Sequence, residues 1–135
     1  GGVINEIRHL KTKVNAGAEV LLSQLFFDND IFLRFQENCR VADINVPVIP
    51  GIMPVINAAQ IKRMITMCGV AFPARFEKII HRYEDNKEAL FDAGMSYALS
   101  QIIDLLVSDI EGIHLYTMNN PHVARRICEG IKNII

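Results

Sequence analysis

A single amide, Gln24, interrupts the most apolar part of the chain. The segment 18–28 reads Ala-Glu-Val-Leu-Leu-Ser-Gln-Leu-Phe-Phe-Asp, and such a run is typical of a strand that is covered on both faces. A buried amide needs hydrogen-bond partners. The partners of Gln24 are either neighbouring protein groups or a ligand at the open end of a parallel barrel, where barrel enzymes place their sites. The residues alone leave both readings open.

The other residues with reactive side chains do not form a recognisable motif. His81, His114 and His122 have neither metal-ligand spacing nor a nucleophile motif beside them, so we expect no metal site. The three cysteines are scattered without a Cys-x-x-Cys pair, which is typical of reduced thiols in a cytosolic protein. No glycine-rich phosphate loop is present in the sequence.

Composition limits the class of protein. The chain has 135 residues, enough for one domain with a core, and half of them are hydrophobic. A formal net charge of −1 without a long basic patch argues against disorder and against nucleic-acid binding. No apolar run reaches the roughly 18 uncharged residues of a membrane span, and the first residues do not resemble a signal peptide. We therefore expect a soluble, cytoplasmic protein without a membrane partner.

Helical and strand patterns alternate along the chain. Ile7, Leu10 and Val14 recur at helical spacing, and Gly17 follows where a helix would end. Asparagines and aspartates supply N-caps, and Pro50-Gly51 predicts a stiff turn. The expected helices cover 4–16, about three turns after the caps at 28–30, 57–68, 73–83, 85–107 and 121–130. Gly69 is expected to end the third of these helices, and residues 119–120 are expected to cap the last. The expected strands cover 19–26, 46–49 and 112–118.

This order predicts an α/β fold with about three parallel strands and flanking helices. Three strands do not complete such a fold, because a closed barrel needs eight strands and about 250 residues. The outer strands would keep unpaired edges. We therefore expect residues 1–135 to form a single partial domain, completed by another copy in a homo-oligomer or by another polypeptide.

Several segments together resemble one family. Leu-Lys-Thr-Lys-Val-Asn-Ala-Gly-Ala at 10–18, followed by Ser-Gln-Leu-Phe-Phe-Asp at 23–28, is similar to the LKxKVxAGA and TQxFF signature of the flavin-dependent methylenetetrahydrofolate reductases. The segments 32–35, 48–54 and 114–119 resemble later segments of that family in the same order. The resemblance implies a (β/α)8 TIM-type barrel, of which this chain supplies the part from the helix before the sixth strand to the helix after the eighth.

The resemblance also implies a cofactor and its binding residues. The family holds FAD at the C-terminal ends of the strands and uses a reduced pyridine nucleotide, NADH or NADPH, as electron donor. Lys13 matches a position that faces the pyrophosphate, and Glu6 replaces a usual aspartate that accepts from hydroxyl groups. His9 and Thr12 fall where relatives also touch the flavin, on what we take to be the same helix face as Glu6.

Folate is the substrate that the resemblance implies, with reduction of 5,10-methylenetetrahydrofolate to 5-methyltetrahydrofolate as the reaction. Gln24 and Gln60 match glutamines that contact it, and Tyr116 can line the site. Asn120 stands where many relatives have an arginine, and an amide cannot form the charge-assisted pair of a guanidinium with a carboxylate. Met64 stands where some relatives place an aromatic ring, although methionine can pack against a ring face.

The catalytic acidic residues of the family lie on early strands, so the resemblance places no catalytic residue within this chain, and we expect the isolated chain to be inactive. Two alternatives remain open. One is a non-catalytic, barrel-derived module that assembles with another subunit; Asn120 and Met64 favour it. The other is a related flavin reductase that acts on another pterin or one-carbon carrier.

Overall fold

The computed structural model describes residues 2–68, 72–108, 110–117 and 120–134, without the side chains of residues 2–4, 24, 67 and 68. Within these ranges six helices and three strands follow one another in the predicted order. They are α1 (Gly2–Asn15), β1 (Leu21–Leu25), α2 (Asn29–Val41), β2 (Val48–Ile52), α3 (Ala58–Cys68), α4 (Ala74–Tyr83), α5 (Lys87–Val107), β3 (His114–Leu115) and α6 (Pro121–Ile131).

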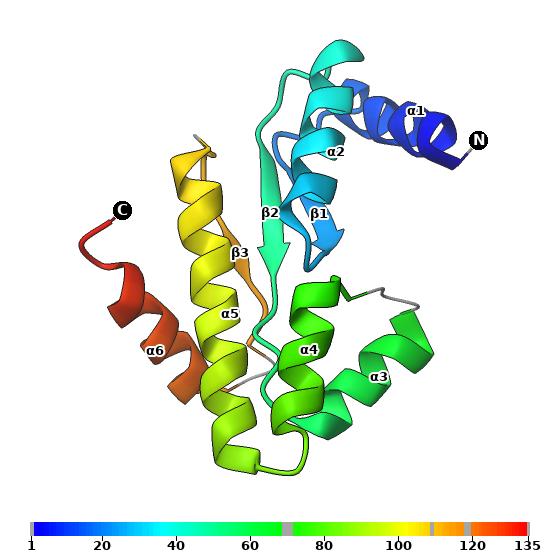
Figure 1. The fold of residues 1–135 in the computed structure, drawn as a ribbon. Coiled ribbons are helices and arrows are strands. Elements are labelled where there is room, and N and C mark those ends of the chain that lie inside the picture. Colours follow the sequence, from blue (N-terminus) through cyan, green and yellow to red (C-terminus); the bar gives the residue numbers. More distant parts are fainter. Residues whose placement is uncertain (1, 69–71, 109, 118–119, 135) are drawn as a thin grey trace.

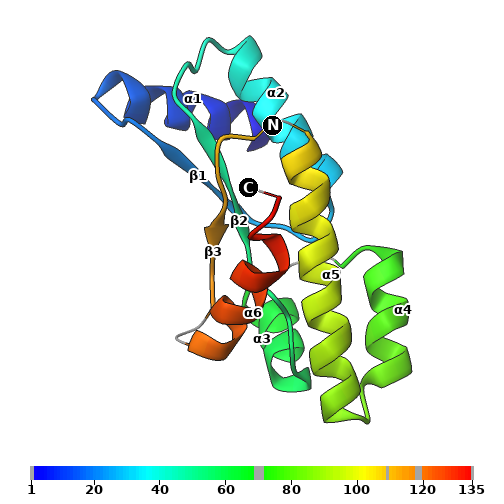
Figure 2. The same cartoon turned by 90° about the vertical axis from the view of Figure 1, so that its left-hand side faces the viewer.

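The three strands form one parallel sheet in the order β1-β2-β3 (Figure 1). Leu21 pairs with Val48, and Gly51 pairs with His114. Helices α2, α5 and α6 lie on the same side of this sheet (Figure 2). The predicted α/β class with about three parallel strands and flanking helices is therefore confirmed. Three strands do not display a closed barrel, so the barrel type stays a prediction.

Two hydrophobic clusters hold these elements together. The first cluster lies between the sheet and α2, α5 and α6, and its members include Leu21, Phe32, Val48, Ile52, Met95, Ile102, Leu105, Val123 and Ile127. The second cluster joins the segments after β1 and β2 to α3, α4 and α5, and its members are Phe27, Met53, Val55, Ile61, Met64, Phe72, Phe76 and Leu90. The C-terminal ends of the strands thus rest on a core of their own.

Helix α5 contributes to both clusters. Among the described residues it is the one helix whose length and hydropathy match those of a membrane span, a test that core helices of soluble proteins also meet. Its apolar residues Leu90, Met95, Ile102 and Leu105 are at most 2% exposed in the fold. Packing against the sheet and the neighbouring helices thus accounts for the hydrophobic side of α5.

Strand β2 corrects one prediction. The Pro50-Gly51 pair was expected to form a turn after a strand at 46–49, but both residues lie inside β2. Pro50 has no N–H to donate, and the Gly51 N–H donates to the Ser23 hydroxyl at 3.0 Å, at the point where the β1–β2 register shifts. A Cβ at position 51 would lie 2.8 Å from the Tyr116 ring. The glycine thus permits a close approach within the sheet.

The other two strands are shorter than predicted. β1 covers Leu21–Leu25 rather than 19–26, and β3 covers His114–Leu115 of the predicted 112–118, whose last residue lies outside the described part of the structure. β3 is short because only Gly51 and Ile52 of β2 pair with it. Hydropathy marks apolar residues, whereas strand ends depend on where a partner strand offers hydrogen bonds.

The helix caps agree better with the sequence. The side chains of Asp28, Asn86 and Asn120 accept hydrogen bonds from the first turns of α2, α5 and α6, and Gly17 has a φ of +112° just after α1. Small corrections are that α5 begins at Lys87 rather than 85, that Pro73 precedes α4 as its N-cap, and that α6 continues through Gly130 to Ile131. The expected roles of Gly69 and Asn119 lie outside the described residues.

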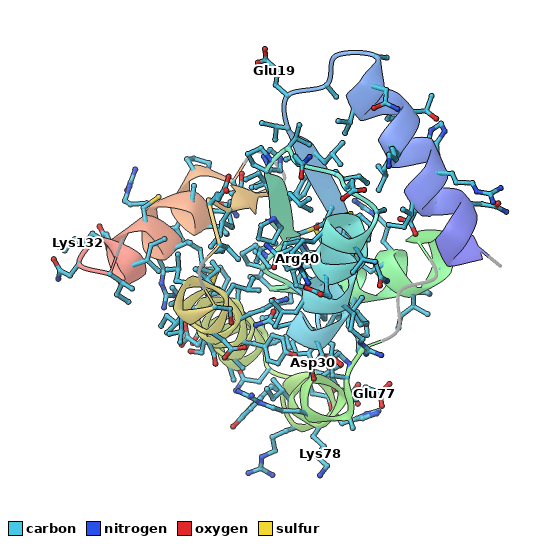
Figure 3. All side chains as sticks on the ribbon, turned by 90° about the horizontal axis from the view of Figure 1, so that it is seen from above. Glu19, Asp30, Arg40, Glu77, Lys78 and Lys132 are labelled. Carbon is cyan, nitrogen blue, oxygen red and sulfur yellow. The ribbon has the colours of Figure 1, made fainter. Side chains whose placement is uncertain are left out.

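Charged side chains are spread over the periphery. Figure 3 shows Glu77 and Lys78 pointing outward from α4, Glu19 before β1 and Lys132 after α6. All four side chains are exposed. Glu77 and Lys78 are adjacent charges of opposite sign, and α4 also carries Arg75 and Arg82.

Candidate functional site

One cavity, of about 400 Å³, lies between α1, β1 and α2, and we call it the α1 cavity. Glu6, His9 and Lys13 line it from one face of α1. The opposite wall is mostly apolar and consists of Leu22, Ser23, Leu25, Phe26, Ile31, Phe32 and Phe35. Three of the four predicted cofactor-binding residues therefore share one cavity, which combines a cation, an imidazole and a carboxylate with an apolar wall.

Helix α1 is held in place by contacts that the sequence did not reveal. The Lys11 ammonium donates to the carbonyl of Ala42, just after α2, at 2.8 Å. Leu10 and Val14 pack against the first cluster. Burial raises the pKa of the Cys39 thiol on α2, and the nearby Glu6 carboxylate raises it further. Glu6 thus faces α2, as its place in the cavity requires.

Thr12 does not share this cavity. Its hydroxyl donates to the Arg8 carbonyl one turn earlier at 3.0 Å, and its side chain is exposed. Placing Thr12 on the same face as Glu6 was wrong, because six residues of an α-helix amount to about 600°, which leaves the two side chains about 120° apart. Lys13, seven residues after Glu6, returns to nearly the same direction.

Gln24 lies in β1, and its side chain is outside the described part of the structure. Its neighbours Ser23 and Leu25 both line the α1 cavity. Successive positions of a strand alternate between its two faces, so this lining does not by itself place Gln24 in the cavity. Substrate binding by Gln24 remains a prediction.

A second cavity, of about 310 Å³, lies where β2 and β3 lead into α3 and α6, and we call it the α3–α6 cavity. The two predicted substrate residues Gln60 and Asn120 line it together with Arg63 and Thr117. Pro54, Ile56, Asn57, Ala59 and Val123 complete its wall. Arg63 is the one charged residue of this lining, so the cavity is positive.

Both predicted residues of the α3–α6 cavity also hold the local backbone. The Gln60 carboxamide accepts from the Ile56 N–H at 2.9 Å and donates to the Pro54 carbonyl at 3.2 Å. The Asn120 side-chain oxygen accepts from the N–H groups of His122 and Val123 at 3.1 and 3.3 Å. These bonds fix the two loops that form the cavity wall.

Tyr116 and Met64 lie beside this cavity rather than in its lining. The Tyr116 ring meets the His114 ring edge-on at 4.4 Å between centroids and packs against the second cluster. The Met64 side chain is only 5% exposed and belongs to the second cluster. Met64 thus fills the core under α3, where its flexible thioether can adapt to neighbouring rings.

Three polar residues at this end of the fold were missed. Arg63 lies one turn after Gln60, a spacing that puts both on one face of α3. Tyr97 and Gln101 interrupt the apolar stripe of α5, and Gln101 is a buried amide, 6% exposed. A polar residue inside a core stripe was the available signal for Gln101. Within the described ranges, no group of three or more His, Cys, Asp or Glu side chains is arranged to hold a metal ion.

Comparison with known proteins gives one consistent answer. Residues 2–132 match the sequence model of the methylenetetrahydrofolate reductase family. The chain is 39% identical to "Methylenetetrahydrofolate reductase (NADH) 1" of Arabidopsis thaliana over 115 residues, which are 85% of this chain and 19% of that protein. It is 34% identical to "5,10-methylenetetrahydrofolate reductase" of Escherichia coli (strain K12) over 126 residues, which are 93% of this chain and 43% of that protein.

A third relative matches the chain to a similar extent. "Methylenetetrahydrofolate reductase 1" of Schizosaccharomyces pombe is 33% identical over 125 residues, 93% of this chain and 21% of that protein. The chain thus spans less than half the length of these curated relatives, although nearly all of its own length is matched. The match over residues 2–132 establishes that this chain belongs to the methylenetetrahydrofolate reductase family.

Proposed function

We propose that this chain is part of an FAD-dependent reductase that converts 5,10-methylenetetrahydrofolate to 5-methyltetrahydrofolate within a (β/α)8 barrel. The chemistry that FAD supplies when bound is hydride transfer, from a reduced pyridine nucleotide to the flavin and then to the methylene carbon of the folate. NADH or NADPH is the proposed donor, and the name of the Arabidopsis thaliana relative includes NADH. The residues of this chain would bind and orient the two partners of that reaction.

The observation that carries the proposal is the α1 cavity with Glu6, His9 and Lys13 on one wall. The Lys13 ammonium suits a phosphate oxygen, and the Glu6 carboxylate suits hydroxyl hydrogens. The apolar wall around Phe26 and Phe32 suits uncharged ligand surface. This donor set fits one portion of a dinucleotide such as FAD, and the remainder would contact other parts of the full-length protein.

Removing the Lys13 charge is the test of this assignment. Lys13→Ala in the full-length protein is expected to weaken FAD binding about ten- to hundredfold, because a charge-assisted hydrogen bond contributes about 1.5–3 kcal/mol. Titration of the apoprotein, followed by flavin fluorescence, measures the change. Lys78→Ala on α4, an exposed lysine far from the cavity lining, is the control and is expected to keep the parental affinity. An unchanged affinity of Lys13→Ala for FAD would show that the flavin does not bind in the α1 cavity.

The α3–α6 cavity is the proposed site for part of the folate. Gln60 and Asn120 present amides there, and Arg63 supplies the positive charge that Asn120 lacks. A folate carries glutamate carboxylates, which are the natural partners of a guanidinium. Position 63 can therefore take over the recognition of an anionic group from position 120.

Loss of the Arg63 charge is expected to discriminate between two ligands. Arg63→Ala in the full-length protein should weaken binding of a folate about tenfold, and should leave binding of a pterin without the glutamate unchanged. Isothermal calorimetry of both ligands measures the difference. Lys62→Ala, the exposed neighbour outside the cavity lining, is the matched control. An equal loss of affinity for both ligands would show that Arg63 does not bind the glutamate carboxylates.

A second candidate function is a non-catalytic module that assembles with another subunit. It is favoured by the Gln60 and Asn120 side chains, whose hydrogen bonds in the described structure go to backbone groups before α3 and in the first turn of α6. FAD binding and flavin reoxidation in the full-length protein distinguish the two functions, because a reductase binds FAD and its reduced flavin is reoxidised by the folate. A protein that gains no flavin absorbance on titration with FAD would be the assembly module. Reoxidation only by a different pterin or one-carbon carrier would instead indicate a related reductase.

A further inference from the structure

We propose that Tyr97 and Gln101 of α5 are positioning residues for the ligand-binding end of β1. The proposal rests on the proposed function, together with the prediction from the family resemblance that Gln24 of β1 contacts the folate. Both side chains reach from the long helix to the two residues that follow β1, and neither belongs to the α1 cavity or the α3–α6 cavity. They lie instead along a third cavity, of about 370 Å³, between α2, α4 and α5.

The contacts form an ordered pair. The Gln101 carboxamide donates to the Phe26 carbonyl at 3.0 Å, and the Tyr97 hydroxyl donates to the Phe27 carbonyl at 2.6 Å. Residues 97 and 101 are one helical turn apart, and their acceptors are consecutive. Two adjacent peptide planes are therefore held from one rigid helix, directly after the strand that carries Gln24.

This location makes the orientation of β1 dependent on α5. The Phe26 and Phe27 carbonyls lie beyond the end of β1 at Leu25, where the β1–β2 ladder gives them no partner. Gln101 is buried, and a hydrogen bond to a buried group is strongly directional and costly to lose. A rotation of the Phe26 peptide would be transmitted to position 24, two residues earlier.

The Tyr97 side chain and the backbone of α5 at Gln101 are themselves held in place. The Tyr97 ring stacks on Phe76 of α4 at 4.4 Å between centroids, and the Arg75 guanidinium lies 5.5 Å from its centre. Burial raises the pKa of Tyr97, so its hydroxyl stays protonated as a donor at neutral pH. The Asn29 side chain donates to the backbone carbonyl of Gln101 at 3.0 Å and to the Asp104 carboxylate at 2.9 Å, which ties the start of α2 to the same helix.

The test separates positioning from simple stabilisation. In the full-length protein, Gln101→Leu is expected to raise KM for 5,10-methylenetetrahydrofolate about tenfold, and Tyr97→Phe about threefold, the range set by the loss of one hydrogen bond to each carbonyl. The rate of flavin reduction by NADH or NADPH should not change in either variant. Calorimetry with 5-methyltetrahydrofolate should give affinity losses of the same size without turnover.

Two controls match these substitutions. Ser100→Ala lies on the same helix and lines the same third cavity, and Tyr83→Phe removes an exposed tyrosine hydroxyl at the end of α4. Both are expected to keep the parental KM and affinity. Thermal unfolding of all variants reports any loss of stability, and Tyr97→Phe keeps the ring packing if Gln101→Leu fails to fold.

The possible results have distinct meanings. A lowered melting temperature with unchanged KM and folate affinity in both variants would overturn the positioning role and leave the proposed function intact. Equal losses in both half-reactions would also overturn it, because they indicate general damage. If the parental protein binds no FAD, or its reduced flavin is not reoxidised by the folate, the proposed function fails, and the positioning role fails with it.

Discussion

Replacing Gly94 with alanine is expected to lower the free energy of unfolding by about 3 kcal/mol or more. A Cβ at position 94 would lie 1.8 Å from the carbonyl oxygen of Val55 and 2.9 Å from its carbon. Both atoms are backbone, so no side-chain rotation can relieve the clash, and α5 must move away from the segment after β2. Circular dichroism during thermal and chemical unfolding of the full-length protein measures the loss.

The sign of this effect is informative, because an isolated helix prefers alanine to glycine by about 1 kcal/mol. Gly112→Ala is the matched control: its Cβ would meet Ile49 at 3.6 Å, an ordinary contact. We expect that variant to stay within about 0.5 kcal/mol of the parent. A neutral or stabilising Gly94→Ala would mean that α5 does not approach Val55 as closely as the fold requires.

Truncation of Phe76 to alanine is expected to cost about 4 kcal/mol. Phe76 is 1% exposed, and its ring lies 4.4 to 5.7 Å from the rings of Phe27, Phe72 and Tyr97. The substitution leaves a cavity at the centre of the second cluster, and it removes the ring on which Tyr97 stacks. We therefore also expect a higher KM for the folate, by about the same factor as in Tyr97→Phe.

Phe76→Leu separates volume from aromatic stacking. It keeps most of the buried volume, so its expected cost is about 1.5 kcal/mol. Unfolding of the full-length protein gives both values, and steady-state kinetics gives KM. If Phe76→Ala unfolds at the parental temperature, the second cluster does not hold α4 against the end of β1.

The helices and their caps followed from the sequence because their causes are local. Asp28 and Asn120 cap helices within three residues of themselves, and Gly17 takes a positive φ that its own lack of a Cβ allows. The alternation of apolar blocks with helical periodicity also predicted the order of all nine elements. None of these features needs knowledge of distant contacts.

The strand boundaries and the role of Pro50-Gly51 depended on partners elsewhere in the chain. A proline-glycine pair predicts a turn on local grounds, but here Gly51 receives its hydrogen-bond partner from Ser23 and its steric limit from Tyr116. Gly94 is similar: the sequence shows a weak point in a helix, whereas the fold shows a contact with Val55. Pairing and close approach are properties of two segments, so one segment cannot predict them.

The sequence likewise predicted only part of the candidate site. Residue types, motifs and their order were enough to indicate the family, and the helical repeat places Glu6, His9 and Lys13 on one face of α1. The same repeat places Thr12 about 120° from Glu6, and only the tertiary structure separates the predicted residues into two cavities and adds Arg63 to the second. It alone reveals that Tyr97 and Gln101 bind the segment after β1, because a polar residue in a core stripe does not show which partner, 70 or 75 residues away, it will meet.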